Sequence, residues 1–113
     1  MQQNARLFEF EIDAEPNATI DYGVKTVQFG DGYEQRQKMF LGRPLETWKV
    51  KHTGDIYDIS QIKHFLDDHK GLTPFQWVDP FGVQRLIVVN GFDVRQVDGR
   101  VWRVEFEMRE VRE

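Results

Sequence analysis

Hydrophobic and polar residues alternate with a period of two in three stretches of the first half of the chain, at residues 6–13, 24–29 and 45–53. This period is typical of β-strands that bury one face and expose the other. We therefore expect three strands there. The apolar side chains that share one face are Phe8, Phe10 and Ile12 in the first stretch, Val27 and Phe29 in the second, and Trp48 and Val50 in the third. Those of the first and third stretches are expected to face inward.

The spacing of apolar residues changes to three and four between residues 55 and 70, which predicts one amphipathic α-helix. Asp55 or Asp58 is suited to cap its start, because a carboxylate accepts hydrogen bonds from the first free backbone N–H groups. Gly71 is suited to the position after its end, which often has a left-handed conformation. The residues that follow the helical spacing are Ile56, Ile59, Ile62, Phe65, Leu66 and His69.

Strand patterns return after the helix, at residues 74–78, 86–89, 92–97 and 101–111. Asn90-Gly91 and Asp98-Gly99 separate the last three, and such dipeptides favour two-residue hairpin turns. These three strands are therefore expected to form a β-meander. Loops or turns are expected where Pro, Gly, Asn or Asp interrupt the patterns, at residues 15–18, 30–32, 39–44 and 79–82.

The apolar faces of this meander meet only if one turn contains an extra residue. With two-residue turns at both sites, Val104 would share a face with Asp93 and Arg95. One extra residue reverses the alternation, so we expect a β-bulge with a left-handed glycine at one turn. The alternative is that both faces are partly buried. The apolar run at residues 86–89 fits a strand that is covered on both sides.

The chain has 113 residues, and we expect all of it, residues 1–113, to form a single domain. The patterns predict a mainly β (α+β) fold, an antiparallel β-sandwich or barrel flanked by one α-helix at about residues 55–70. Aromatic residues make up 13% of the chain, which is enough to build a packed core.

Charge and composition exclude several classes of function. The net charge of −4 argues against a general nucleic-acid binder, which neutralises phosphates with clustered lysine and arginine. Cysteine is absent, so disulfides and cysteine-based metal sites are excluded. No apolar run approaches the ~20 residues that cross a bilayer, and the N-terminus lacks the features of a signal peptide. We expect a cytoplasmic protein, or one exported only as part of an assembly.

No arrangement typical of an enzyme is present, and we expect no catalytic residue, metal ligand or cofactor. His64 and Asp68 are four residues apart on the predicted helix, a spacing that can place two metal ligands on one face. Two groups at so common a spacing favour a solvated helix face instead. The acidic pairs expected on the surface are Glu9 with Glu11, Asp67 with Asp68, and Glu105 with Glu107.

A nucleic-acid surface is the next alternative, because basic residues occur near aromatic ones, and such surfaces stack single strands. Acidic residues interrupt this pattern, and Trp48 is at a core-facing position, so we expect no specific nucleic-acid binding. The residues concerned are Lys25, Tyr33, Arg36, Lys38, Arg43, Trp48, Lys49 and Lys51.

The most unusual segment lies at residues 29–36, where two glycines flank an aspartate and define a tight turn. One interpretation is a hairpin turn in which Asp31 bonds its own backbone. The other is an ordered loop that docks on a neighbouring subunit, with Arg36 paired to a carboxylate across the interface. The candidate interface residues are Phe29, Gly30, Asp31, Gly32, Tyr33, Gln35 and Arg36.

This segment, Phe-Gly-Asp-Gly-Tyr-x-Gln-Arg, resembles the characteristic motif of the phage minor tail protein M family of phage lambda and its relatives. The resemblance continues through residues 65–71 and 75–77 to the last strand at 103–106, and so covers nearly the whole chain. The loop at 39–44, the residues 80–82 and the meander turns depart from it.

The resemblance implies a tail-tube-like β-sandwich or barrel and a structural role without catalysis or cofactor. It also implies a ring, a hexamer in the virion, between the tail tube and the tip hub, on which the tail assembles. The expected partners are copies of the chain and neighbouring tail proteins. The expected locations are the phage tail and, during assembly, the host cytoplasm. We also hypothesise that an acidic strand face, such as Glu105 and Glu107, lines or adjoins the tail channel.

A second candidate function is a carbohydrate-binding module of the tail tip, because exposed tryptophans stack on sugars. This interpretation requires Trp48, Trp77 or Trp102 to be exposed, whereas their positions on apolar strand faces predict that at least two belong to the core. A small hydrolase is a third candidate, without any supporting constellation of residues.

Overall fold

The structure, a computed structural model, describes residues 5–38 and 44–112. Within these ranges the chain contains strands, one α-helix and a short 3₁₀ turn, η1 (Gly30–Gly32). The strands are β1 (Leu7–Phe8), β2 (Asn17–Ile20), β3 (Val24–Gln28), β4 (Glu34–Lys38), β5 (Glu46–Gly54), β6 (Phe75–Val78), β7 (Gln84–Val88), β8 (Phe92–Asp98) and β9 (Val101–Glu110), and the helix is α1 (Ile56–His69). The prediction of a mainly β fold with one helix is confirmed.

Seven of these strands form one sheet in the order β1-β6-β7-β9-β5-β2, with β8 also paired to β9. β3 and β4 form a separate two-stranded sheet. The pairs in the large sheet are antiparallel, apart from the parallel pair between β1 and β6. The sheet is therefore mixed rather than wholly antiparallel.

The predicted meander is wrong at its first turn. β7 and β8 lie one after the other along the same side of β9, so they do not pair with each other. Val88 and Phe92 are four positions apart, whereas their partners Arg109 and Phe106 are three apart. The segment with Asn90-Gly91 thus contains one more residue than the stretch of β9 beside it, and it does not reverse the direction of the chain. The long strand β9 provides an edge along which both strands satisfy their backbone hydrogen bonds.

The second turn contains the expected bulge. The pairing of β8 with β9 shifts by one residue between Gln96 and Asp98, beside Gly99, whose φ is +24°. This extra residue reverses the alternation, as the apolar pattern required. The cross-strand pairs that result are Phe92 with Phe106 and Val94 with Val104.

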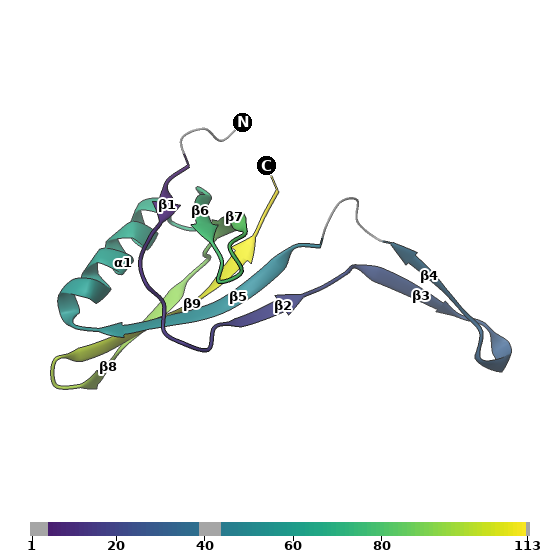
Figure 1. Cartoon of the computed structure of the whole chain (residues 1–113), viewed down its shortest axis with the longest axis horizontal. Coiled ribbons are helices and arrows are strands. Elements are labelled where there is room, and N and C mark those ends of the chain that lie inside the picture. The colour runs from purple at the N-terminus through teal and green to yellow at the C-terminus, as the bar shows by residue number, and fades with distance from the viewer. Residues whose placement is uncertain (1–4, 39–43, 113) are drawn as a thin grey trace.

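Helix α1 covers one face of the large sheet (Figure 1), and the core lies between them. Asp55 is the N-cap, and its Oδ1 accepts a hydrogen bond from the Asp58 N–H at 3.0 Å. Lys70 has the left-handed conformation at the C-terminal end, with φ +54°, and Gly71 follows with φ +71°. Ile56, which follows the helical spacing, is 53% exposed at the start of the helix and so does not belong to its buried face.

Aromatic rings fill much of this core. Phe75 is completely buried and packs edge-on against Phe65, with ring centroids 5.1 Å apart. Phe8 is also buried, and its ring contacts those of Phe10, Phe65 and Phe106.

The first predicted strand is shorter than expected. Only Leu7 and Phe8 form β1, because the chain then leaves β6 and runs along β5, where the Asp13 N–H donates to the Lys51 carbonyl at 2.7 Å. The inward orientation of Phe8, Phe10 and Ile12 is confirmed by their packing against the core. Strand β2 occupies part of the loop expected at residues 15–18, and β4 was not anticipated.

The hairpin of β3 and β4 extends away from the rest of the chain (Figure 1). The molecule with its hairpin measures 61 × 36 × 24 Å. The loop expected at residues 39–44 falls mainly on residues 39–43, outside the described part. Among the described residues, no helix has the length and apolar character needed to cross a membrane.

Candidate assembly surfaces

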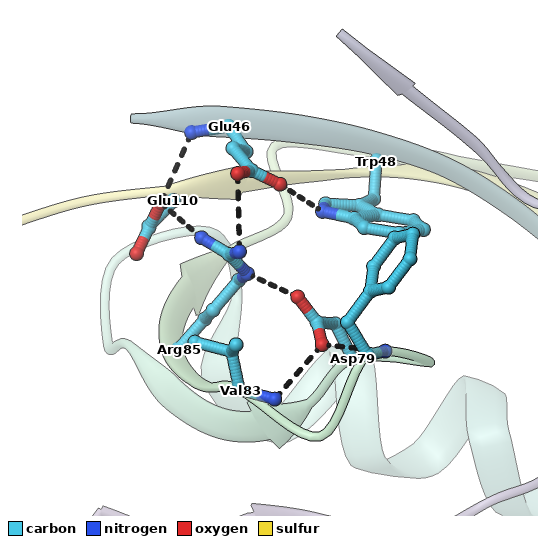
Figure 2. Close-up of polar contacts among 7 residues, drawn as sticks. Glu46, Trp48, Asp79, Val83, Arg85 and Glu110 are labelled. Atoms are coloured by element: carbon cyan, nitrogen blue, oxygen red, sulfur yellow. Dashed lines mark hydrogen bonds and ion pairs between the residues drawn. The ribbon is translucent and has the colours of Figure 1, made fainter. Parts of the chain in front are cut away.

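A single buried arginine pairs with three carboxylates beneath one end of the sheet (Figure 2). The Arg85 guanidinium lies 2.7 Å from Asp79 Oδ2, 2.9 Å from Glu110 Oε1 and 3.1 Å from Glu46 Oε2. The side chains of Asp79, Glu110 and Arg85 are at most 5% exposed. The cluster connects β5, β7, β9 and the turn after β6.

Hydrogen bonds compensate for the excess negative charge of this cluster. Burial by itself would raise the pKa of Asp79, but donation from the Val83 N–H and from Arg85 outweighs it and holds that pKa below its ordinary value. Burial would likewise lower the pKa of Arg85, and the three carboxylates raise it instead. Glu46 accepts a further bond from Trp48 Nε1 at 3.1 Å. Asp79 and Arg85 are therefore ionised, and the contacts of Arg85 with the three carboxylates fix the cluster in one arrangement.

The sequence analysis missed this cluster, although alternation contains a signal for it. Arg85 has the same parity as Ile87 and Val89, and all three are buried. A charged residue at an inward position of a strand needs a buried partner of opposite charge. Asp79 is at the matching inward position after Trp77. The partners from β5 and β9 depend on the sheet order, which no local pattern gives.

The same aspartate organises the turn between β6 and β7. Asp79 Oδ1 accepts hydrogen bonds from the backbone N–H groups of Phe81 and Val83, both at 2.9 Å. The turn holds Phe81 at its tip, where the residue is 83% exposed. The ring of Phe81 still contacts Trp48, with centroids 6.2 Å apart. The buried cluster thus supports a rigid turn that carries an exposed aromatic side chain.

The charged residues do not form a recognisable catalytic or metal site. The Arg85 cluster is inaccessible to a substrate, and the described residues contain no group of three potential ligands for a metal ion. His64 Nε2 is 3.8 Å from Asp68 on the helix surface, as expected for a solvated face. Hydrogen bonding from Arg6 is the main cause that lowers the pKa of Asp68. His69 Nδ1 contacts the Phe65 carbonyl at 2.8 Å, at the end of the helix.

The candidate interface residues at positions 29–36 all lie at the exposed end of the projecting hairpin. Asp31 has φ +61° and Gly32 φ +80°, so the turn is left-handed at two successive residues. Phe29 and Tyr33 face each other across it, the Phe29 N–H donating to the Tyr33 carbonyl at 2.8 Å. Arg36 pairs with Glu34 of its own strand at 3.0 Å, so its charge is already paired within its own chain.

Alternation gives the hairpin two different faces. One face, here called the aromatic face, consists of Lys25, Val27, Phe29, Tyr33, Gln35 and Gln37, and it contains no carboxylate. The opposite face carries the pair formed by Glu34 and Arg36, together with Lys38 and Val24. Phe29 is 55% exposed and Tyr33 73% exposed. The aromatic face therefore presents two exposed rings and one cation, and no described residue of the body covers it.

A trough of about 830 Å³ lies on the face of the large sheet that is opposite to the helix. The loop of residues 13–17 forms one wall, and the start of β8 forms the other. Lys49 is paired with Glu107, and Lys51 with Glu105, across β5 and β9. The acidic strand face proposed from the sequence is thus interleaved with lysines, although carboxylates outnumber them in the trough. The charged residues that line it are Asp13, Glu15, Lys49, Lys51, Asp93, Glu105 and Glu107.

The tryptophans are mostly internal. Trp48 is 3% exposed and Trp77 4% exposed, and the two rings pack edge-on with centroids 5.4 Å apart. The prediction that at least two tryptophans belong to the core is confirmed. Trp102 is partly buried and lies beside Tyr57 at a surface hollow.

Comparisons with known proteins agree on one family. The family model described as phage minor tail protein matches residues 6–112. Tail tip protein M of Escherichia phage N15 is 28% identical over 95 residues, which are 84% of this chain and 69% of that protein. Tail tip protein M of Escherichia phage lambda is 34% identical over 58 residues. This second match spans 51% of the chain and about half, 53%, of the lambda protein.

Solved structures show the same fold. A chain from the virion of a native gene transfer agent particle superimposes with a TM-score of 0.80, at 14% identity over 97% of this chain and 98% of that one. A chain from the tail of an empty gene transfer agent particle with C6 symmetry gives a TM-score of 0.50, at 16% identity over 90% and 78%. With the family match over nearly all described residues, the predicted resemblance is confirmed: the chain belongs to the phage minor tail protein family.

Proposed function

We propose that this protein is a structural subunit of the phage tail tip, which forms a hexameric ring between the tail tube and the tip hub and supports assembly of the tail. Its partners are other copies of itself and the neighbouring tail proteins. It assembles in the host cytoplasm, remains in the virion, and acts without catalysis, cofactor, membrane or specific nucleic-acid contact.

The observation that carries this proposal is the hairpin of β3 and β4. A two-stranded ribbon without a core is at best marginally stable in water. This one has no buried residue, because every side chain in β3 and β4 is exposed or half-buried. It also extends away from the body of the chain (Figure 1). A ribbon of this kind gains stability when another subunit covers it, which favours an assembly role.

The edges of the large sheet support the same conclusion. In the described part of the chain, β2 pairs only with β5, and β8 pairs only with β9. Each therefore presents one edge of backbone N–H and C=O groups that a neighbouring subunit can use. A closed ring requires two different complementary surfaces on each copy. The hairpin and the sheet edges provide surfaces of different kinds.

The comparisons support the proposed location and symmetry. The related proteins from lambda and N15 are tail tip proteins, and one structural neighbour comes from a tail with C6 symmetry. We propose the same location, the tail tip, and the same six-fold symmetry for this chain. The carbohydrate-binding alternative loses support, because Trp48 and Trp77 are enclosed in the core and only Trp102 is partly accessible.

The test is to replace residues 24–38 by a short Gly-Ser linker and to purify tails formed with the shortened chain. We expect the body to fold, because the core cluster contains no residue of this range, and we expect the shortened chain to be missing from the tails. Electron microscopy of tails with the intact chain should show a six-fold ring next to the tip. Normal incorporation of the shortened chain, or a position elsewhere in the tail, would contradict the proposal.

A further inference from the structure

The aromatic face of the hairpin is exposed in the described part of the chain. Lys25, Val27, Phe29 and Tyr33 share this face, and the two aromatic residues are more than half exposed. The hairpin extends away from the body (Figure 1), so the body does not cover it. Burial of two aromatic side chains is a strong driving force for association, at roughly 25 cal/mol per Å² of apolar surface.

The trough on the large sheet has the opposite character. Five carboxylates and two lysines line it, together with the apolar side chains of Pro16 and Phe92. Asp93 lies directly opposite Glu105 across β8 and β9. Like charges in this position destabilise a strand pair. Lys51, opposite Glu105 across β5 and β9, and the neighbouring pair Arg95 and Arg103 compensate part of this repulsion. A further cation over Asp93 would reduce it further.

The dimensions of the two surfaces also agree. Lys25 and Phe29 are four residues apart along an extended strand, a separation of roughly 13 Å at about 3.3 Å per residue. Three strand spacings of about 4.8 Å separate β8 from the segment beyond β5, a distance of roughly 14 Å. A hairpin laid across the strands therefore places its lysine over Asp93 when its aromatic tip reaches the loop of residues 13–17.

We propose that the aromatic face of the β3–β4 hairpin of one copy lies across the trough of the next copy. Lys25 pairs with Asp93 and Glu105 of that copy, and Phe29 and Tyr33 pack on the loop around Pro16. This contact deepens the proposed ring, on which it rests, by naming the two surfaces that join successive subunits. Because the surfaces differ, the contact is head-to-tail and repeats from copy to copy.

The absence of cysteine from the chain makes a direct test simple. The variant Lys25→Cys/Asp93→Cys is treated with a bismaleimide that contains a reducible disulfide, in purified tails and, separately, in the concentrated purified chain. The spacer is needed because a lysine–aspartate pair separates the Cα atoms by more than the about 7 Å that a direct disulfide spans. We expect a ladder of reducible multimers in both preparations. Lys38→Cys/Asp93→Cys is the matched control from the opposite hairpin face and should give no ladder. Either single-cysteine variant should also give none.

Charge reversal is the second arm of the test. Lys25→Glu should lower the yield of a Tyr33→Cys/Pro16→Cys ladder several-fold, and addition of Asp93→Lys should restore it. Lys38→Glu, an equal change of charge on the other face, should have no effect. Circular dichroism of each variant establishes that the body is folded.

The outcomes separate this inference from the proposed function. Tails that contain the chain but give no ladder, together with no ladder from the concentrated chain, overturn the inference and leave the ring proposal standing. A cross-linked product between position 25 and a different tail protein also overturns it. If the chain is missing from tails, the ring proposal fails, and the ladder from the purified chain still decides whether hairpin and trough bind each other.

Discussion

Removal of the buried arginine tests how the sheet end is held together. We expect Arg85→Met to lower the free energy of unfolding by about 3–5 kcal/mol at pH 7.5, the range for breaking a buried ion pair by removal of one partner. The variant leaves Asp79, Glu46 and Glu110 without the cation that lies within 3.1 Å of each. The methionine preserves most of the packing volume, so the loss of stability reports the removal of the positive charge.

The size of the effect makes it measurable by thermal denaturation. For a chain of this length, 1 kcal/mol corresponds to roughly 3–5 °C in Tm, so the expected decrease is roughly 10–20 °C. Arg85→Lys should give an intermediate loss, because a lysine retains the charge but does not offer the planar donors that serve several carboxylates at once. The exposed residue Arg95 provides the control, and Arg95→Met should stay within about 0.5 kcal/mol of the parent.

The loss of stability in Arg85→Met should depend on pH in a defined direction. In the parent, the pKa of Asp79 is below its ordinary value, so its ionisation stabilises the fold above the unfolded pKa of about 3.9 and this contribution disappears as the pH falls through the folded pKa. Arg85→Met removes the hydrogen bond and the charge of Arg85, which are two of the causes that lower this pKa, so the variant has less of this contribution to lose. The difference in stability between the two proteins should therefore decrease as the pH falls below about 3.9.

Urea denaturation at pH 7.5 and at about pH 3, below the unfolded pKa of Asp79, measures this difference. A deficit that is clearly smaller at the acidic value supports the account of a buried carboxylate left without its cation. A loss below about 1 kcal/mol at pH 7.5, or a deficit of equal size at both values, would show that Arg85 does not compensate buried charge.

Two further predictions concern the helix cap and the hairpin turn. Asp55→Ala should lower the free energy of unfolding by about 1 kcal/mol, because the Asp58 N–H loses its acceptor. Asp55→Asn retains an acceptor oxygen and should preserve most of the stability. Chemical denaturation measures both variants, and equal losses would contradict the capping role. Gly32→Ala should destabilise the turn by about 1–2 kcal/mol, because an alanine is strained at the φ of +80° that this position has. The added Cβ has no atom within 4 Å, so backbone strain is the only cost. Hydrogen exchange should become faster in β3 and β4 without a change in the core, and faster exchange throughout the chain would refute this local effect.

The sequence by itself determined the local elements. The spacing of Ile59, Ile62 and Phe65 gave the helix, and Asp55 was among the two caps expected for it. Alternation placed Trp48 and Val50 inside, and the mismatch of apolar faces around Asp98-Gly99 required the bulge that the structure contains. These features depend on neighbours within a few residues along the chain, so a local pattern is sufficient to predict them.

Tertiary structure decided which strands pair and which charges meet. Asn90-Gly91 has the composition of a hairpin turn, yet β7 and β8 continue along the same side of β9 because the long strand offers both of them hydrogen-bond partners. The Arg85 partners Glu46 and Glu110 come from β5 and β9, and only the sheet order brings them to the arginine. The motif at residues 29–36 was visible in the sequence, and the two faces of the hairpin follow from local alternation, but its projection from the body and the trough on the large sheet could not be predicted from a local pattern.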